Sequence, residues 1–350
     1  MKKFLYFTTI AMVLFSCKKD EEEITPEVPV TLGFYVLNEG AFQQNNASIS
    51  YLASNDQILA DPYFDKNEVP LGDVLQSYVS SGDRGYAVLN NNNKIEVFNR
   101  SSWENVTTIE GITYPRYIVS GGNGKLYVSA GAFSGSVYVI NPTSNTVETT
   151  IAVGNGPERM MALNGKLFVC NSGGWLEDNT VSVIDLSTNA VVSTITVGDR
   201  PMDIDVDANG KVWVLCTGKT VWNPEPPYNI LEETAARLVS IDPTSYEVDV
   251  NTTVGVVGDH PKHLEIGNNS NTLYYLNNKL YAFNTNGGDL PGTILIDQNF
   301  NSLDLRDGQD LWLTSTSNFT TPSTLFCYSL NGVLLNQWTA GIGTNGVVFF

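Results

Sequence analysis

Short runs of alternating apolar and polar residues, each closed by a polar turn, follow one another along most of this chain. The clearest example spans residues 181–214. A run at 181–184 leads through a polar turn at 187–189 into a second run at 191–197. Alternation with period two is typical of β-strands, so the pattern predicts that these two runs pair as a hairpin.

The same stretch contains two further runs. A Gly-Asp-Arg-Pro break at 198–201 separates the hairpin from a run at 204–206, and a turn at 207–210 joins that run to another at 212–215. Four strands in about 40 residues are typical of one blade of a β-propeller. Helical periodicity is almost absent from the chain, which favours the all-β class.

Breaks that would precede an innermost strand recur at similar intervals. Five contain proline, with spacings of 45, 42, 44 and 60 residues, and these are Pro70, Pro115, Pro157, Pro201 and Pro261. A sixth break, without proline, stands at residues 299–301, and residues 346–350 offer a seventh inner strand. These spacings are within the range of propeller blades, apart from one insertion in the interval of 60 residues.

The two ends of the chain complement each other. The seventh inner strand has no residues after it to form its outer strands, whereas the runs at 34–37 and 49–52 have no inner partner. We therefore predict that the two ends form one blade together, because closure removes the exposed edge that an open ring would leave. The predicted fold is an all-β, seven-bladed β-propeller over residues 33–350.

The longest loops are predicted on one face. In a propeller, the links that enter the innermost strands share a face with the links between second and third strands. The latter are long here, at 38–48, 90–93, 129–136, 171–180, 217–237 and 314–323. The opposite face has only tight Asn-Gly turns, at 123–124, 164–165, 209–210 and 331–332. Long loops on one side of a rigid scaffold usually serve binding.

The content of these loops suggests ligand contacts. They supply flat aromatic side chains, an amide and guanidinium groups, and the candidate contacts are Phe42, Gln43, Arg116, Arg159, Trp175, Trp222 and Tyr228. For each aromatic residue taken singly, packing within its own loop is the alternative. The cluster is stronger evidence for binding than its members are.

Composition and charge narrow the possible functions. The formal net charge of −18 disfavours nucleic acid as a partner, because an acidic surface repels phosphate backbones. The chain has two histidines and no zinc-ligand spacing, so we predict no catalytic residue, no metal site and no cofactor. Four carboxylates on inner strands, Asp203, Asp205, Glu265 and Asp304, leave two alternatives open: a cation in the central channel, or a solvated channel with acidic walls.

The N-terminus has the form of a secretory leader. Residues 1–16 combine two lysines with an apolar run too short to span a bilayer, and residues 14–17 resemble a bacterial lipobox, which would place lipid on Cys17. An ordinary signal peptide with an incidental cysteine is the alternative. Residues 17–32 would then form a flexible tether. The charged run at 18–23 resembles the surface-export signal of Bacteroidetes lipoproteins, and the alternative is that it is merely a solvated part of the tether. The expected location is the outer membrane, lipid-anchored and facing the exterior.

Two resemblances follow from these motifs. Residues 181–214 resemble the YVTN (YncE-like) propeller repeats of prokaryotic surface and periplasmic proteins. The segments 38–43, 46–51, 71–77 and 115–118 resemble the propeller lipoproteins of gut Bacteroidetes related to the cobalamin-binding BtuG proteins. The second resemblance implies a surface lipoprotein that captures a corrinoid (vitamin B12) and passes it to a TonB-dependent outer-membrane transporter.

Other functional classes remain open beside corrinoid capture. An adhesion or scaffold protein would use the same face against protein or glycan, and a wide, flat surface would favour it over a concave pocket. A carboxylate-metal hydrolase would require a divalent cation at the channel mouth. With two histidines in the chain, His260 is a candidate to reach the cobalt of a corrinoid, and the favoured alternative is a structural or merely exposed histidine.

Overall fold

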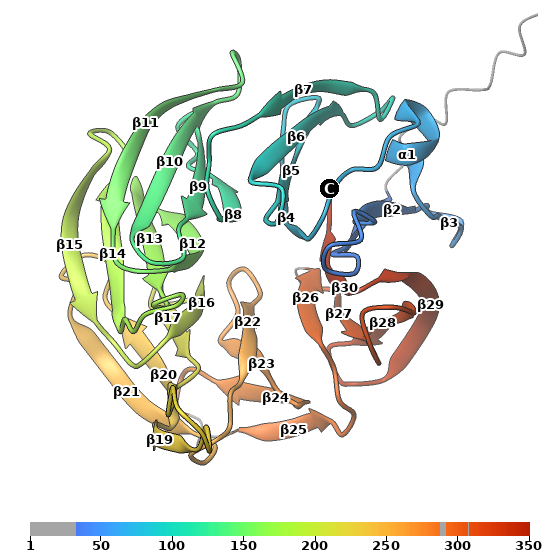
Figure 1. The fold of residues 1–350 in the computed structure, drawn as a ribbon. Coiled ribbons are helices and arrows are strands. Elements are labelled where there is room, and N and C mark those ends of the chain that lie inside the picture. Colours follow the sequence, from blue (N-terminus) through green and yellow to red (C-terminus); the bar gives the residue numbers. More distant parts are fainter. Residues whose placement is uncertain (1–32, 288–291, 307) are drawn as a thin grey trace, which may run out of the picture.

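The computed structural model describes residues 33–287, 292–306 and 308–350. In this part of the chain, seven four-stranded antiparallel sheets surround a central axis (Figure 1), and β18 and β19 form a separate two-stranded sheet. The predicted all-β, seven-bladed β-propeller is therefore confirmed. The predicted signal peptide (1–16), the lipidated Cys17 and the tether up to residue 32 lie outside the described residues. Among the described helices, none is long and apolar enough to cross a membrane.

Six blades follow one another along the chain, each written here from its innermost to its outermost strand. The first three are β4 (Leu75–Ser81), β5 (Arg84–Leu89), β6 (Lys94–Asn99) and β7 (Asn105–Ile109); β8 (Pro115–Ser120), β9 (Leu126–Ala130), β10 (Gly135–Asn141) and β11 (Thr146–Val153); and β12 (Pro157–Leu163), β13 (Lys166–Asn171), β14 (Thr180–Asp185) and β15 (Ala190–Thr196). The next three are β16 (Pro201–Val206), β17 (Val212–Cys216), β20 (Ala236–Ile241) and β21 (Val248–Val254); β22 (Lys262–Ile266), β23 (Thr272–Asn277), β24 (Lys279–Asn284) and β25 (Thr293–Ile296); and β26 (Ser302–Arg306), β27 (Asp310–Ser315), β28 (Pro322–Ser329) and β29 (Leu334–Ile342).

The two ends of the chain share the remaining blade, as predicted. Its order is β30 (Thr344–Val348), β1 (Phe34–Asn38), β2 (Ser48–Leu52) and β3 (Ile58–Leu59), with β30 innermost. The inner strand begins two residues earlier than the expected start at residue 346. The reason is Thr344, whose buried hydroxyl donates a 2.7 Å hydrogen bond to Asn38 Oδ1 and whose backbone N–H donates to Ser323 Oγ.

Each sheet is buried on both of its faces, because neighbouring blades pack against one another. In β14, for example, Val181 and Val183 pack in a cluster with Val214 of the following blade, whereas Ile184 packs in a cluster with Val139 of the preceding blade. All these side chains are inaccessible to solvent. Burial of apolar surface at about 25 cal/mol per Å² is therefore distributed around the whole ring.

Two elements were not predicted. The helix α1 (Pro62–Asn67) precedes β4 and is capped by Asp61, whose carboxylate accepts the backbone N–H of Phe64. The long loop expected at 217–237 contains the paired strands β18 (Thr220–Trp222) and β19 (Ile230–Glu233). Both faces of this hairpin are largely exposed, so its sequence lacks the alternation of a half-buried strand.

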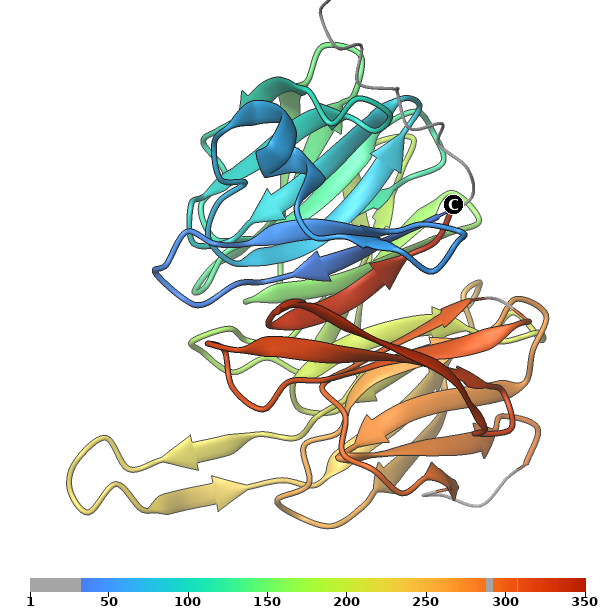
Figure 2. The same ribbon diagram turned by 90° about the vertical axis from the view of Figure 1, so that its right-hand side faces the viewer.

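One face of the ring carries the long links, and it is called the insertion face below. It includes residues 39–47, 172–179, 217–235 and 316–321, which connect second to third strands, and the links that enter the innermost strands. Figure 2 shows the β18–β19 hairpin projecting from this face, at the lower left of the view. The topology thus places the long links on one side, as expected from the sequence.

Candidate functional site

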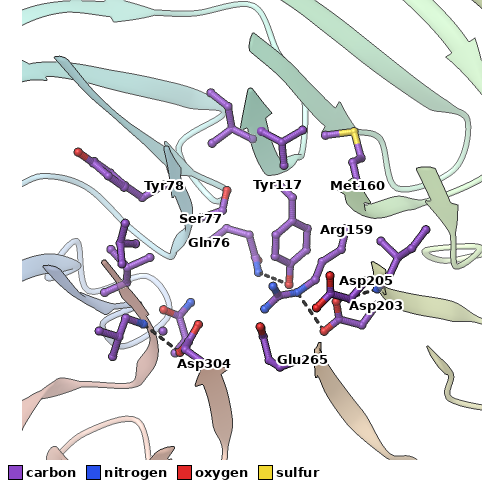
Figure 3. Close-up of a pocket in the computed structure, with 18 of the residues that line it drawn as sticks. Gln76, Ser77, Tyr78, Tyr117, Arg159, Met160, Asp203, Asp205, Glu265 and Asp304 are labelled. Carbon is purple, nitrogen blue, oxygen red and sulfur yellow. Dashed lines mark hydrogen bonds and ion pairs between the residues drawn. The ribbon is translucent and has the colours of Figure 1, made fainter. Parts of the chain in front are cut away.

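Most innermost strands carry a β-bulge near their first residue. The register to the second strand shifts in β4, β8, β12, β16 and β22, between Leu75 and Ser77, Pro115 and Ile118, Pro157 and Met160, Pro201 and Asp203, and Lys262 and Leu264. A bulge leaves a residue out of the ladder, bends the strand and re-aims side chains. Figure 3 shows the result: Gln76, Tyr117 and Arg159, which stand within these bulges, reach into the central channel.

An ion pair links two blades at the channel mouth. The Nε and Nη2 of Arg116 both donate to the carboxylate of Glu158, at 2.9–3.1 Å, and Arg116 Nη1 donates to Gln76 Oε1 at 2.8 Å. Gln76 Nε2 in turn donates to the hydroxyl of Tyr117 at 3.3 Å. Bidentate guanidinium–carboxylate contacts fix orientation as well as distance, so three neighbouring blades share one rigid polar network.

Arg159 occupies the middle of the channel (Figure 3). Its Nε lies 3.3 Å from Asp203 Oδ2, and its guanidinium carbon lies 5.0 Å from the centroid of the Tyr117 ring. Glu265 and Asp304 also attract it electrostatically. One cation therefore faces several carboxyl groups that project from successive inner strands.

These carboxyl groups also connect the blades. Asp203 accepts the backbone N–H of Leu264 at 3.0 Å, and Asp205 accepts that of Ile266 at 2.6 Å. At the closing blade, Asp304 accepts the backbone N–H of Val347 at 2.9 Å. In each case the donor belongs to the inner strand of the next blade. Three of the four carboxyl groups on the inner strands therefore have a structural role, which is to hydrogen-bond one blade to the next.

Burial in the channel shifts the ionisation of these groups. Desolvation raises the pKa of Asp205 and of Asp304 to about 7. The pKa of Glu265 is raised well above its usual value, first by desolvation and then by the nearby charges of Asp205 and Asp304. Within the described residues, no three His, Cys, Asp or Glu side chains are arranged to hold a metal ion.

Three hollows adjoin one another along the axis and on the insertion face. The channel cavity, about 330 Å³, is lined by residues from all seven inner strands, including Gln76, Tyr117, Arg159, Asp203 and Asn345. A hollow of about 210 Å³ shares four of these residues and adds others at the mouth, among them Glu39, Lys262, His263 and Phe319. Lys262 also lines a lateral hollow of about 380 Å³, together with Arg200, Met202, Thr217 and His260.

The predicted contact residues fall into two groups. Arg159 lines the channel cavity, and Arg116 braces the mouth through Glu158 and Gln76. The other five lie outside these three hollows, on exposed links of the insertion face, namely Phe42, Gln43, Trp175, Trp222 and Tyr228.

The exposed aromatic residues are spread over several blades. Phe42 is 63% exposed, and Trp175 is 76% exposed and stacks on Phe133 with ring centroids 6.4 Å apart. Trp222 and Tyr228 belong to the β18–β19 hairpin and its tip. The backbone N–H of Gln43 donates to Asp73 Oδ2 at 2.8 Å, which holds this link against the next blade. The structure thus separates an aromatic rim from a charged centre.

Sequence analysis missed several residues of that centre, chiefly Gln76, Tyr117, Lys262 and Asn345. Tyr117 and Lys262 stand one or two residues after the proline of a break, as Arg116 and Arg159 also do. Position relative to the break was therefore a usable signal.

Comparisons with known proteins establish the fold and a family. No curated protein matches the chain. The hydrazine synthase of Kuenenia stuttgartiensis is 12% identical, with a TM-score of 0.61, over 85% of this chain and 90% of that one. A quinonprotein alcohol dehydrogenase-like protein from Bacteroides thetaiotaomicron is 13% identical, with a TM-score of 0.63, over 91% and 78%. A protein from Lactobacillus plantarum is 14% identical, with a TM-score of 0.63, over 91% and 100%.

Similarity at this level of identity supports the propeller fold alone. At the level of sequence, residues 32–299 match the family model described as Domain of unknown function (DUF5074). The match covers well over half of the chain, and it includes the bulged inner strands from β4 to β22. The chain therefore belongs to the DUF5074 family.

Proposed function

We propose that this protein is a lipid-anchored capture protein of the cell surface, which binds a corrinoid on its insertion face and delivers it to a TonB-dependent outer-membrane transporter. The observation that carries the proposal is the set of exposed aromatic side chains on the same face as the charged channel mouth. Phe42, Trp175, Trp222 and Tyr228 are each 58–76% exposed. Large exposed aromatic side chains grouped on one face are typical of binding surfaces.

The chemistry of a corrinoid matches this division of the face. A corrin has broad apolar faces, a rim of amides and, in complete cobalamins, one phosphate in the nucleotide loop. Aromatic planes such as Trp175 suit the apolar faces, and amides such as Gln43 and Gln76 suit the rim. Cationic side chains on the insertion face suit the phosphate.

The scaffold supports tight binding because it is preorganised. The Arg116–Glu158 pair, the Arg159–Asp203 pair and the interblade hydrogen bonds hold the inner strands before any ligand arrives. Little conformational entropy then remains to be lost at the channel mouth on binding. The lipid on Cys17, the surface location and the transfer to a transporter rest on the sequence motifs alone.

A second candidate function is adhesion to a protein. The β18–β19 hairpin projects from the ring (Figure 2), and it exposes Trp222, Ile230 and Leu231 at 58%, 43% and 60%. A projecting arm with apolar side chains suits a protein partner better than a small ligand.

Isothermal titration calorimetry of the purified protein with cyanocobalamin tests the proposed function. We expect saturable binding, and we expect Trp175→Ala to weaken it by on the order of 2 kcal/mol, as the truncation of a buried aromatic contact does. Leu335→Ala is the control, because Leu335 is also exposed but lies near the turn at 330–333 on the opposite face. Absence of both heat and thermal shift at high micromolar ligand would reject the corrinoid and favour adhesion.

A further inference from the structure

The lateral hollow of about 380 Å³ on the insertion face is basic, although the protein as a whole is acidic. The cationic side chains that line it are Arg200 and Lys262, and the formal net charge of the chain is −18. Its walls come from the links after β13 and β17, from the links before β16 and β22, and from residues at the start of β12, β16, β18 and β22. Cations gathered in a concave site focus a positive potential there.

Arg200 is held in place mainly by its backbone. Its φ of 56° is left-handed, its N–H donates to Asp178 O at 3.0 Å, and its carbonyl accepts the N–H of Thr217. The guanidinium donates through Nη2 to Gly174 O at 2.9 Å, which is its only hydrogen bond to the described residues. Because a guanidinium has five N–H donors, most of them remain available to a ligand.

His260 forms a fixed part of the wall. Its Nδ1 donates to the carbonyl of Thr217 at 2.9 Å, and its Nε2 lies 3.1 Å from Thr220 Oγ1 and 3.4 Å from Glu233 Oε1. The imidazole of His260 therefore connects the link before β22 to the base of the β18–β19 hairpin. Both ring nitrogens are engaged, which makes His260 a positioning residue and not the main anion contact.

Lys262 is the first residue of β22 and stands at its bulge. Its ammonium forms no ion pair within 33–287, 292–306 and 308–350, and it lines both the lateral hollow and the channel mouth. Glu158 is the acidic residue among the lining side chains of the lateral hollow, and three contacts with Arg116 engage its carboxylate. Glu39, on the side of the channel mouth, attracts Lys262 electrostatically, but inside the lateral hollow no free carboxylate among the described lining residues faces Arg200 and Lys262.

We propose that this hollow is an oxyanion subsite, in which Arg200 and Lys262 bind a phosphate or carboxylate group of the captured molecule. The hydroxyls of Ser172, Thr217 and Thr220 line the same hollow, but they donate to Gly156 O, Arg200 O and Glu233 Oε1, so the two cationic side chains are the donors proposed for the anion. The location of the subsite follows from the geometry above, whereas the identity of the molecule that carries the anion rests on the proposed function.

The test compares two corrinoids that share the macrocycle. Cyanocobalamin carries the phosphodiester of the nucleotide loop, and cobinamide lacks it. We expect Lys262→Gln to weaken cyanocobalamin binding about tenfold in calorimetry and to leave cobinamide binding unchanged. Lys66→Gln is the matched control, because it removes the same charge from α1, outside the hollow.

Inorganic phosphate and acetate, titrated alone at constant ionic strength, separate the subsite from the proposed function. If either anion binds the wild-type protein and binds the Lys262→Gln variant about tenfold more weakly, the subsite is supported even if no corrinoid binds, and the stronger of the two identifies the anion class. If cyanocobalamin binds both proteins equally well and neither anion binds the variant more weakly, the subsite is wrong and corrinoid capture stands. If no anion and no corrinoid binds, both proposals are wrong.

Discussion

At the scale of the residue, the channel carboxyl groups make stability depend on pH. The pKa of Asp304 is about 7 in the folded protein, against a usual value of 3.8, because the group is buried. Between about pH 4 and pH 7 the folded state therefore holds a proton that the unfolded state has released. The contribution of such a group to stability is fully present below the unfolded pKa and is lost as pH rises through the folded pKa.

We therefore expect the melting temperature to be higher at pH 5 than at pH 8, and Asp304→Asn to reduce this difference. The amide still offers a carbonyl oxygen to the backbone N–H of Val347, so the interblade hydrogen bond is preserved. Asp185→Asn is the control, because hydrogen bonds from Lys166 and Ser187 lower the pKa of Asp185 instead of raising it. Equal pH dependence of melting in the wild type and Asp304→Asn would contradict the assignment.

At the scale of the element, β30 and the residues after it pack against both neighbouring blades. Val347 of β30 is buried, and the Phe349 that follows packs edge-on against Phe34 at 5.3 Å. The Phe350 ring lies 4.4 Å from Tyr35 and 4.3 Å below the guanidinium of Arg100. The five residues of β30 thus pair with β1, and the two aromatic residues after it pack against Phe34, Tyr35 and Arg100.

Deletion of residues 343–350 should accordingly lower the melting temperature far more than deletion of residues 18–30. The first deletion exposes β1 and its buried side chains at about 25 cal/mol per Å² of apolar surface, whereas the second removes only residues of the predicted tether. Differential scanning calorimetry of the two truncated proteins decides the point. Equal melting temperatures would show that the shared blade contributes little.

At the scale of the whole molecule, the proposed surface location leads to a further prediction. If Cys17 carries lipid and the domain faces outward, protease added to intact cells should degrade the protein. Protection that persists until the cells are broken would contradict the surface location. Cys17→Ala should release a folded, unanchored protein, because the described residues close their own ring without the N-terminal segment. Retention of this variant in the membrane fraction would exclude Cys17 as the anchor.

The sequence by itself determined the blade architecture. Strand alternation, the proline breaks and the Asn-Gly turns act over a few residues, so each blade is encoded locally. The unmatched inner strand at the C-terminus was enough to predict that the ends share a blade. The placement of the long links on one face was also predictable, because the connectivity of the strands alone assigns each link to a face.

Only the tertiary structure decided how the centre is built. The Arg116–Glu158 pair joins residues 42 positions apart, and Arg200 meets Lys262 in one hollow across a long insertion. A β-bulge is a property of two paired strands, so the direction in which Arg159 or Tyr117 points follows from pairing that no single run of sequence contains. The raised pKa values of Asp205 and Asp304 have the same origin, because desolvation arises only when the inner strands assemble around a common axis.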